Sequence, residues 1–586
     1  MKNKIKIVLG MIIICGSCAF VSCKDMLEID SNIYLNTDNH RLDSANDSLY
    51  SVVGILKQLQ QLGDRYIVLG ELRGDLMEVT KNADMHLQAV ANFTATTDNP
   101  YVSTKEYYAI INNCNYYLQH IDTTIISAGK KAMKGEYAVV KTIRAWTYMQ
   151  LVLNFGKAVY LTEPILTIDD MNKNYPVMEP QDLIFKLLPD VLECMDLAVY
   201  PNYGGALSRI YFIPAPVLAG DMLLWMGSYT KNPMFYELAA NIYYRFIVAS
   251  KYTGAGFYRN TYRNNEFNAL GNGSWCDVFM ISSGEAISSI AYDTNPSVTL
   301  VWPKIMRLTY EKSTETAFEY MLKPSKAAID LWKNETYVHY TEEKELFYTK
   351  GDLRGECKSS ASSSIPLGSY YYHVTDGDSL PVIAKFGYSI KNSISHYRPY
   401  VHLFRAGKLF LRYAEALNGL EKPSLAFAVL KHGLNREVLG DTVGRNRIIN
   451  PDEIRPEIPV YCDFTDQMYS VDNQQHPHGI HTRGSGYVNR DTAYYAFKKE
   501  TLDNQDYYGF PASLATKQDS ILFVDAMICK ELGLETAFEG NRFHDLMRFS
   551  IRRDDQEFLA KWVGRRDPAL VGKLMNRDKW YLPSPN

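Results

Sequence analysis

Residues 131–154 read KAMKGEYAVVKTIRAWTYMQLVLN and contain the clearest helical pattern in this 586-residue chain. Apolar side chains recur there at spacings of three and four residues, namely Val139, Ile143, Trp146, Met149 and Leu153. Such spacing places them on one face of a helix, which must be buried against a partner. Gly156 follows closely and is typical of a helix end. The stretch therefore predicts an amphipathic helix in a helical core.

Further helices are predicted on both sides of this one. Most of residues 41–250 has helical spacing, with segments at 103–121, 181–198, 214–228 and 234–250, and prolines break the pattern at Pro164, Pro176, Pro180 and Pro201. Later in the chain, 402–418 carries an apolar stripe of Leu403, Ala406, Phe410, Tyr413 and Leu417. Gly419 ends that pattern and 424–435 begins the next, so we expect an antiparallel helical hairpin. The hairpin resembles a tetratricopeptide unit, although no strict repeat of about 34 residues is present.

Two regions are predicted to consist mainly of loops. Residues 251–400 and 439–516 are rich in Gly, Asn and Ser, and short β-like stretches occur at 287–292 and 369–374. The expected fold is thus mainly α, a tetratricopeptide-like helical scaffold with long irregular loops and minor β elements. Loops on a rigid scaffold are where a binding protein carries its specificity.

The first 22 residues have the pattern of an export signal. Lys2, Lys4 and Lys6 precede an apolar run at 7–14 that is too short for the roughly 20 residues of a spanning helix. A small residue then precedes Cys23, as in bacterial lipoprotein signals, and the polar residues of 23–40 suit a solvated tether. We therefore expect 1–22 to be removed and Cys23 to carry lipid. Cys18 is a rival attachment site, and an ordinary signal peptide is the alternative.

Charge and cysteine usage exclude several classes of protein. Loss of 1–22 would remove three lysines and no acid, which changes the net charge from −4 to about −7. A protein that binds nucleic acid needs a basic surface, so that class is not favoured. The cysteines beyond the signal region are far apart and include no C-x-x-C pair, which argues against a zinc ribbon or a dense disulfide scaffold.

The stretch 535–548, here called the tail motif, reads ETAFEGNRFHDLMR and resembles the C-terminal signature of the SusD/RagB family of outer-membrane lipoproteins. Other matches follow the order found in that family. They are GELRGD at 70–75 (the N-terminal motif), RAW at 144–146, YAEALN at 413–418, GIHTRGSG at 479–486 and YLPSP at 581–585. Cys23 with Asp25 and Leu27 also resembles the family's mature start. Together these matches cover nearly the whole mature chain.

This resemblance implies a tetratricopeptide-containing helical fold, in which 41–250 forms an N-terminal region that packs with 251–586 as one globular unit. It implies a lipid anchor on the outer membrane of a Bacteroidota bacterium, facing the exterior, and a SusC-like TonB-dependent transporter as partner. The leading hypothesis is a non-enzymatic lipoprotein that binds oligosaccharides and delivers them to that transporter. Peptide capture, as by RagB-like members, is the alternative, and an adhesin is a further possibility. No cofactor is expected apart from the lipid on Cys23.

A different class of function would use the acidic residues near the C-terminus. Glu531, Glu535 and Glu539 are spaced four apart and share one helix face. Paired carboxylates can hydrolyse glycosidic bonds, so a surface glycoside hydrolase is a less favoured alternative. Ion pairs with Arg542 and Arg548 would explain the row without any reaction, and we favour that interpretation.

Other catalytic or metal-binding signals are weak. His476, His478 and His481 form an H-x-H-x-x-H group that could bind zinc, but an ordinary loop is favoured because no further ligand motif supports it. The chain contains no G-x-S-x-G elbow, no phosphate-binding P-loop and no complete dinucleotide fingerprint.

Candidate ligand-binding residues come from loop aromatics and from the segment after the N-terminal motif. An aromatic ring can stack on a sugar while polar neighbours bind its hydroxyl groups. The loop aromatics are Tyr258, Tyr262, Trp275, Trp302, Tyr370 and Tyr371. The resemblance directs attention to a second set, Asp75, Asn92, Phe93 and Tyr101. For any single tyrosine, packing between helices is the more common role.

Overall fold

The structure is a computed structural model, and it describes residues between 42 and 584 with gaps. Within that span the description leaves out 43–44, 128–129, 132, 197–207, 253–278, 280–285, 293–302, 311–318, 341–345, 357–367, 376, 387–399, 432, 435, 441–448, 465–478, 486–493, 496–497, 503–504, 509–513 and 515. The predicted signal, the tether and Cys23 lie outside the described residues.

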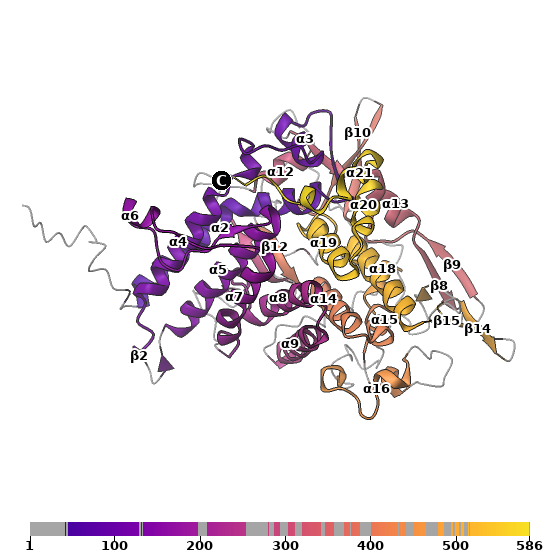
Figure 1. The fold of residues 1–586 in the computed structure, drawn as a ribbon. Helices are drawn as coiled ribbons and strands as arrows, with labels where there is room; N and C mark the ends of the chain where they lie inside the picture. The colour runs from indigo at the N-terminus through magenta and orange to yellow at the C-terminus, as the bar shows by residue number, and fades with distance from the viewer. Residues whose placement is uncertain are drawn as a thin grey trace, which may run out of the picture.

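Helices dominate the described residues, and the strands form only small sheets of two or three strands (Figure 1). This confirms the predicted fold class. The helices of the first half are α2 (Ala45–Ile67), α3 (Met85–Ala91), α4 (Lys105–His120), α5 (Lys134–Phe155), α6 (Ile168–Met171), α7 (Pro180–Glu193), α8 (Ala215–Thr230) and α9 (Pro233–Tyr252). Those of the second half are α12 (Lys304–Thr309), α13 (Lys326–Lys333), α14 (Ala406–Gly419), α15 (Pro423–Lys431), α16 (Arg436–Gly440), α18 (Lys517–Thr536), α19 (Arg542–Arg553), α20 (Gln556–Gly564) and α21 (Val571–Leu574).

Short helices and strands connect these elements. A π-helix, η1, spans Val68–Leu72, and the 3-10 turns are η2 (Pro100–Val102), η3 (Ser208–Tyr211), η6 (Pro451–Glu453), η7 (Val460–Cys462), η8 (Ile480–Gly484), η9 (Pro568–Leu570) and η10 (Arg577–Trp580). The antiparallel strand pairs are β1 (Met77–Val79) with β7 (Leu322–Pro324), β2 (Ile126–Ser127) with β3 (Lys130–Lys131), β4 (Ala158–Val159) with β5 (Val177–Met178), β6 (Ala286–Ala291) with β12 (Tyr400–Arg405), β10 (Tyr370–Thr375) with β11 (Asp378–Ile383), and β14 (Lys498–Leu502) with β15 (Gln505–Tyr508). Strand β8 (Thr336–Tyr340) pairs with both β9 (Leu346–Lys350) and β13 (Tyr494–Tyr495).

Helix α5 confirms the central sequence prediction, although it begins three residues later than the quoted stretch. All five residues of its predicted stripe are buried. Gly156 ends the helix in the left-handed conformation, at φ +76°, and its N–H donates to the carbonyl oxygen of Val152. A Cβ at this position would lie 2.8 Å from the ring of Tyr581, so the glycine also leaves room for the end of the chain.

The long helices from α4 to α9 pack side by side in chain order. Helix α4 packs on α5, α5 on α7, α7 on α8, and α8 on α9. The predicted segments at 103–121, 214–228 and 234–250 are confirmed with small shifts at their ends, whereas α7 ends five residues before the predicted 198. Helices α14 and α15 form the predicted hairpin, and α14 also packs on α9 and α18.

One predicted helix begins too early. Residues 402–405 belong to strand β12, which pairs with β6, and helix α14 starts only at Ala406. Leu403 is therefore on a strand, not on the helical stripe. Every residue of β12 is buried, so the strand lacks the alternation that would have distinguished it from a helix. The predicted β stretches at 287–292 and 369–374 are confirmed as β6 and β10.

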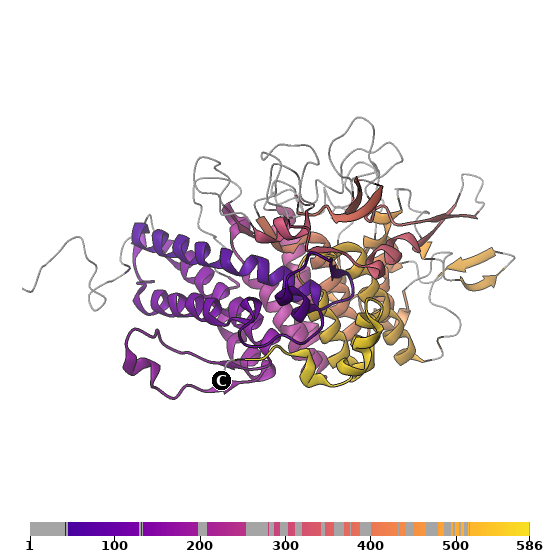
Figure 2. The same ribbon diagram turned by 90° about the horizontal axis from the view of Figure 1, so that it is seen from above.

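The end of the chain returns to the N-terminal helices (Figures 1 and 2). The N–H of Leu582 donates to the carbonyl oxygen of Asn154 at 2.8 Å, and Trp580 is buried. Helix α19 packs on α8 and on η1. These contacts bring the tail motif against the N-terminal motif.

Candidate functional site

The N-terminal motif and the tail motif bind each other in the core. Glu71, in η1, accepts hydrogen bonds from four backbone N–H groups of the tail motif, at 3.0 Å from Phe538, 2.8 Å from Gly540, 3.0 Å from Asn541 and 3.3 Å from Arg542. Burial raises the pKa of Glu71 to about 7, although these four N–H groups oppose the shift. Its side chain closes the start of helix α19, where backbone N–H groups have no partner within the helix.

Other residues of the N-terminal motif complete this contact. Asp75 forms a bidentate ion pair with Arg542, at 2.6 and 3.1 Å, and has no exposed surface. At Gly70, a Cβ would lie 1.9 Å from the carbonyl oxygen of Gly540, so only glycine allows this approach of the two backbones. The two motifs therefore hold the fold together. Asp75 was predicted to bind ligand, and that prediction is wrong because its carboxylate is buried and occupied by Arg542.

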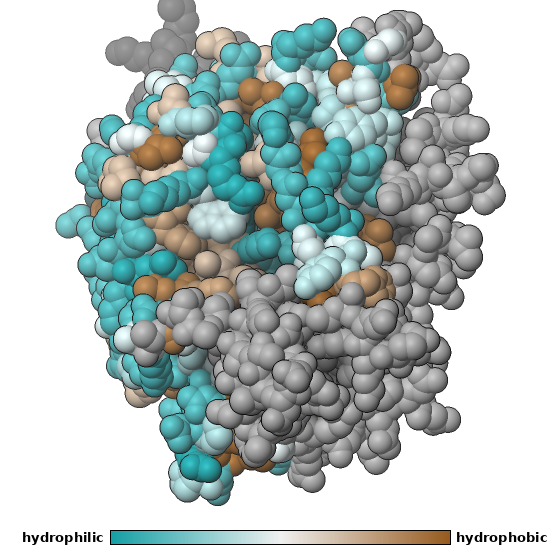
Figure 3. Space-filling view, turned by 90° about the vertical axis from the view of Figure 1, so that its right-hand side faces the viewer, coloured by the Kyte–Doolittle hydropathy of each residue, from teal (hydrophilic) through white to brown (hydrophobic). Residues whose placement is uncertain are grey.

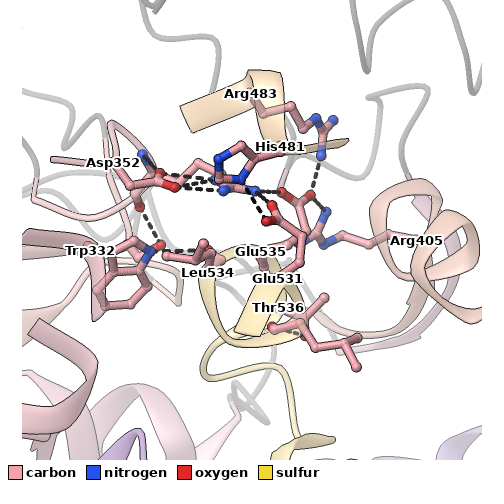
Figure 4. A network of polar contacts seen from close by, with 12 residues as sticks. Trp332, Asp352, Arg405, His481, Arg483, Glu531, Leu534, Glu535 and Thr536 are labelled. Atoms are coloured by element: carbon pink, nitrogen blue, oxygen red, sulfur yellow. Dashed lines mark hydrogen bonds and ion pairs between the residues drawn. The ribbon is translucent and has the colours of Figure 1, made fainter. Parts of the chain in front are cut away.

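The three glutamates of α18 and the tail motif lie in a buried network of ion pairs (Figure 4). Arg354 donates to Glu531 at 2.7 Å and to Glu535 at 2.9 Å. Arg405 donates to Glu535 at 2.6 Å and to Glu539 at 2.7 Å. Further ion pairs complete the network, namely Asp352 with Arg354, Arg483 with Glu535, Lys385 with Glu539 and His481 with Glu531.

This network confirms that the acidic row is structural, but the predicted partners were wrong. Arg542 binds Asp75, and Arg548 binds Glu415 of α14 at 2.7 Å instead. Burial alone would raise the pKa of Glu531, yet Arg354 and His481 outweigh it and lower the pKa to about 2. A glycosidase needs a carboxyl group that reaches its substrate and, for the acid, a raised pKa. Glu531 and Glu535 are only 1% and 0% exposed, so neither meets that need.

His481, from the predicted histidine group, takes part in the same network. Its Nδ1 lies 2.8 Å from Glu531, its ring stacks on Tyr337 at 4.5 Å, and it has no exposed surface. His476 and His478 lie outside the described residues. Among the residues that the structure does describe, no group of three or more His, Cys, Asp or Glu side chains is arranged to hold a metal ion.

The remaining candidate ligand residues differ in their accessibility. Tyr370 has no exposed surface and packs on Trp332 with ring centroids 5.7 Å apart, which corrects its prediction as a ligand contact. Tyr101 and Tyr371 are also buried, at 7% and 8% exposed, and so offer little ring surface to a ligand. Asn92 is exposed and Phe93 is half-buried. Tyr258, Tyr262, Trp275 and Trp302 lie outside the described residues.

The accessible candidates and their neighbours lie in two segments, one around α3 and one at α13 and the β10–β11 hairpin, and we consider the two together. We call the two segments the α3–β10 surface and define it by Asn82, Asn92, Phe93, Lys333 and Tyr372. The side chain of Thr80 donates to the carbonyl oxygen of Tyr320. The hydroxyl group of Tyr320 donates at 2.8 Å to the carbonyl oxygen of Pro381 in β11. Pro381 in turn pairs with Tyr372 across the hairpin. Hydrogen bonds thus link Thr80, just before α3, to the β10–β11 hairpin, and α3 and β10 both lie at the top of Figure 1.

Rigid supports hold the α3 end of this surface. Lys573 donates to the carbonyl oxygen of Asn92 at 3.0 Å, and Arg566 donates to that of Ala91 at 2.9 Å. Phe93 adopts φ +56°, which is unusual for a residue with a side chain, and its ring packs on Phe543 at 5.5 Å. Such backbone strain persists only where the surroundings enforce it, and it is often found at functional sites.

At the other end, a cation and an aromatic ring lie together. The amine of Lys333 is 5.2 Å from the ring centroid of Tyr372 and 3.4 Å from its hydroxyl. Lys333 is half exposed and Tyr372 is half-buried. A ring edged by a flexible amine can stack on a sugar and bind its hydroxyl groups. Sequence reasoning did not select Lys333. Asn82 lies in the segment after the N-terminal motif that the resemblance favours, and Tyr372 belongs to the run of three tyrosines at 370–372.

Comparison with known proteins gives matches among solved structures alone. No family model matches the chain, and no curated protein matches it. A SusD homolog from Bacteroides thetaiotaomicron VPI-5482 is 16% identical, with a TM-score of 0.54, over 94% of this chain and 92% of that one. A SusD superfamily protein from Bacteroides vulgatus ATCC 8482 is 13% identical, with a TM-score of 0.52, over 87% and 89%. A protein described as a putative sugar binding protein from the same organism is 15% identical, with a TM-score of 0.50, over 87% of each chain. The chain therefore has the fold of the SusD superfamily over most of its length.

Proposed function

We propose that this chain is a surface lipoprotein of the SusD type that binds oligosaccharides and delivers them to a SusC-like TonB-dependent transporter in the outer membrane. The observation that carries the proposal is the SusD fold, which spans nearly all of this chain and of its structural neighbours. One neighbour is described as a putative sugar binding protein. The lipoprotein-like start at Cys23 and the ordered motifs from 70 to 585 support the same assignment.

The described surface suits a binder that does not transform its ligand. The α3–β10 surface presents side-chain amides, an aromatic ring and an amine, whereas the acidic row is buried and paired. A shallow surface of this kind gives modest affinity, which is useful because a delivered ligand must be released. No helix among the described residues combines the length and apolar character needed to cross a bilayer. We place the attachment to the membrane at the lipid on Cys23.

A glycan panel tests the binding function directly. We expect the purified chain to bind one class of oligosaccharide without forming new reducing ends, as measured by calorimetry and by mass spectrometry of the sugar. Asn92→Ala and Tyr372→Ala should each weaken binding by about tenfold, since both remove contacts on the α3–β10 surface. Tyr348→Ala is the matched control, because Tyr348 is 60% exposed on β9, outside that surface.

Three other outcomes of the panel would count against the proposal. Binding of a peptide pool but of no glycan would favour the RagB-like alternative. Release of shortened sugars would favour a hydrolase. Absence of any small ligand would favour an adhesin.

Lipid attachment needs a separate measurement. Cells fed an alkyne analogue of palmitate should label the wild-type chain and the Cys18→Ala variant, but not Cys23→Ala. Equal labelling of Cys23→Ala would reject Cys23 as the anchor.

A further inference from the structure

The loop between β4 and β5, residues 160–176, exposes apolar side chains on a rigid support. We call it the α6 loop, because α6 forms its tip at the left edge of Figure 1. Leu166, Ile168 and Met171 at this tip are 50%, 76% and 71% exposed, and Val177 on the returning strand β5 is 62% exposed. We call the first three the apolar knob. Large apolar groups gathered this way mark interaction sites more often than single exposed side chains do.

Hydrogen bonds fix the base of the α6 loop to helix α4. Asn112 accepts from the N–H of Ile165 at 2.6 Å and donates to its carbonyl oxygen at 3.2 Å. Asn115 donates to the carbonyl oxygens of Leu161 and Glu163, at 3.1 and 3.2 Å. Buried and half-buried side chains of α4 thus hold the loop at four points along its backbone.

The tip is fixed as well. Thr167 and Asp170 form a capping box that begins α6, and Lys173 binds both Asp170 and Glu163 at 2.9 Å, which joins the two sides of the loop. The hydrogen bonds of the loop are made within it, to α4 and, through Leu161 and Tyr148, to α5, whereas the apolar side chains of the knob are exposed. A loop ordered in advance loses little conformational entropy when it binds a partner.

The knob lies toward the end of the molecule at which the described chain begins. Leu42, the first described residue, bridges to Ile121 at the C-terminal end of α4. Asn112 is nine residues earlier in the same helix, which corresponds to roughly 14 Å along its axis. A chain anchored through Cys23 enters the fold at this end, so the knob lies on the part of the molecule where the tether joins the fold.

The charge around the knob favours a protein partner over the anionic lipid head groups of the membrane. Residues 163–179 contain four acids and a single lysine, namely Glu163, Asp169, Asp170, Glu179 and Lys173. An acidic rim is repelled by anionic lipid head groups. It is attracted by a protein surface whose apolar recess is bordered by basic side chains.

We propose that the apolar knob docks into an apolar recess with a basic rim on the exterior face of the partner transporter. This inference rests on the proposed function, because it needs a transporter as the second component. By contrast, hydrophilic side chains cover most of the described surface at the other end of the molecule, with small hydrophobic spots between them (Figure 3). The knob therefore serves docking, and the α3–β10 surface serves the ligand.

The test uses the full-length lipoprotein expressed in its native membrane. The double variant Ile168→Thr and Met171→Gln removes apolar character while nearly keeping side-chain shape, and both residues are exposed, so folding should be unaffected. Met575→Gln is the matched control, since Met575 is 46% exposed near α21 on another part of the molecule. Gentle detergent extraction, affinity capture and quantification of the co-purified β-barrel give the readout. We expect at least about a tenfold loss of barrel for the double variant and no loss for the control.

The outcomes distinguish a failure of the docking inference from a failure of the proposed function. If the wild type brings down a barrel and the double variant brings down as much, the docking inference is overturned while the proposed function stands. If the wild type brings down no barrel, delivery to a transporter fails and the inference fails with it. A Cys23→Ser chain that sediments with protein-free vesicles of outer-membrane lipid, and loses this binding in the double variant, would show that the knob binds lipid and would also overturn the inference. Glycan affinity and melting temperature should be unchanged in all these variants.

Discussion

Replacement of Glu71 by Ala should separate the two ends of the chain. Four buried N–H groups of the tail motif would lose their acceptor, and each unsatisfied buried group costs about 1–3 kcal/mol. If water enters and satisfies two of them, the remaining two still cost about 2–6 kcal/mol of the free energy of unfolding. Glu71→Gln is the graded control. Its remaining side-chain oxygen can still accept from the N–H groups of Gly540, Asn541 and Arg542, and only the N–H of Phe538 then faces the NH2 group of the amide. Its cost should be about 1–3 kcal/mol.

Urea unfolding monitored by circular dichroism measures the change in stability, and hydrogen exchange with mass spectrometry locates it. Peptides that contain 538–553 should exchange faster in Glu71→Ala than in the wild type, while peptides from α7 should change less. The reasoning is refuted if Glu71→Ala unfolds at the wild-type urea concentration and keeps full protection of 538–542. It is also refuted if Gln and Ala have equal effects.

Three further changes test the core. Gly70→Ala places a Cβ 1.9 Å from the carbonyl oxygen of Gly540 and should lower the melting temperature. Gly54→Ala is the control: this position in α2 has nothing within 4 Å of the added Cβ, so the melting temperature should rise slightly. Equal shifts in the two variants would contradict the close approach of the backbones at Gly70. Arg354→Met removes a buried cation that three carboxylates share, those of Asp352, Glu531 and Glu535. It should cost about 3–5 kcal/mol in urea unfolding, and a loss below 1 kcal/mol would argue against the network of Figure 4. Stability should also fall as the pH is lowered from about 4.5 toward 2. Burial lowers the pKa of His544 to about 3, and Arg354 lowers that of Glu531 to about 2 despite burial, so the unfolded chain takes up protons first in this range. Between pH 7 and 4.5 the raised pKa of Glu71 has the opposite effect to that of His544, so the test is made below pH 4.5; a melting temperature independent of pH from 4.5 to 2 would refute this.

Much of the helical scaffold could be predicted because its signal is local. Residues of α5 that face the core recur every three or four positions, and a glycine that adopts positive φ follows directly. Strand β12 escaped prediction because all its side chains are buried, so the apolar run continued without a break into the stripe of α14. The motifs that resemble the SusD/RagB family indicated the fold correctly. Two of them, the N-terminal motif and the tail motif, bind each other and so join the two ends of the chain.

The binding surface was harder to predict, because exposure depends on partners far away in the sequence. Asp75 is neutralised by Arg542, which lies 467 positions later, and Tyr370 is covered by Trp332. Neither partner can be inferred from spacing. Asn92 and Phe93 were identified through the resemblance, whereas Lys333 depends on a contact across two elements with Tyr372. The family signature therefore marks the scaffold, and the ligand surface lies beside it.

A crystal structure of the chain with its tightest-binding glycan tests the central claim most directly. The account predicts an intact sugar over the α3–β10 surface, with a ring stacked on Tyr372 or Phe93 and the amide of Asn92 within hydrogen-bond distance. A sugar bound against Glu531 or Glu535, or a cleaved product anywhere on the protein, would contradict it.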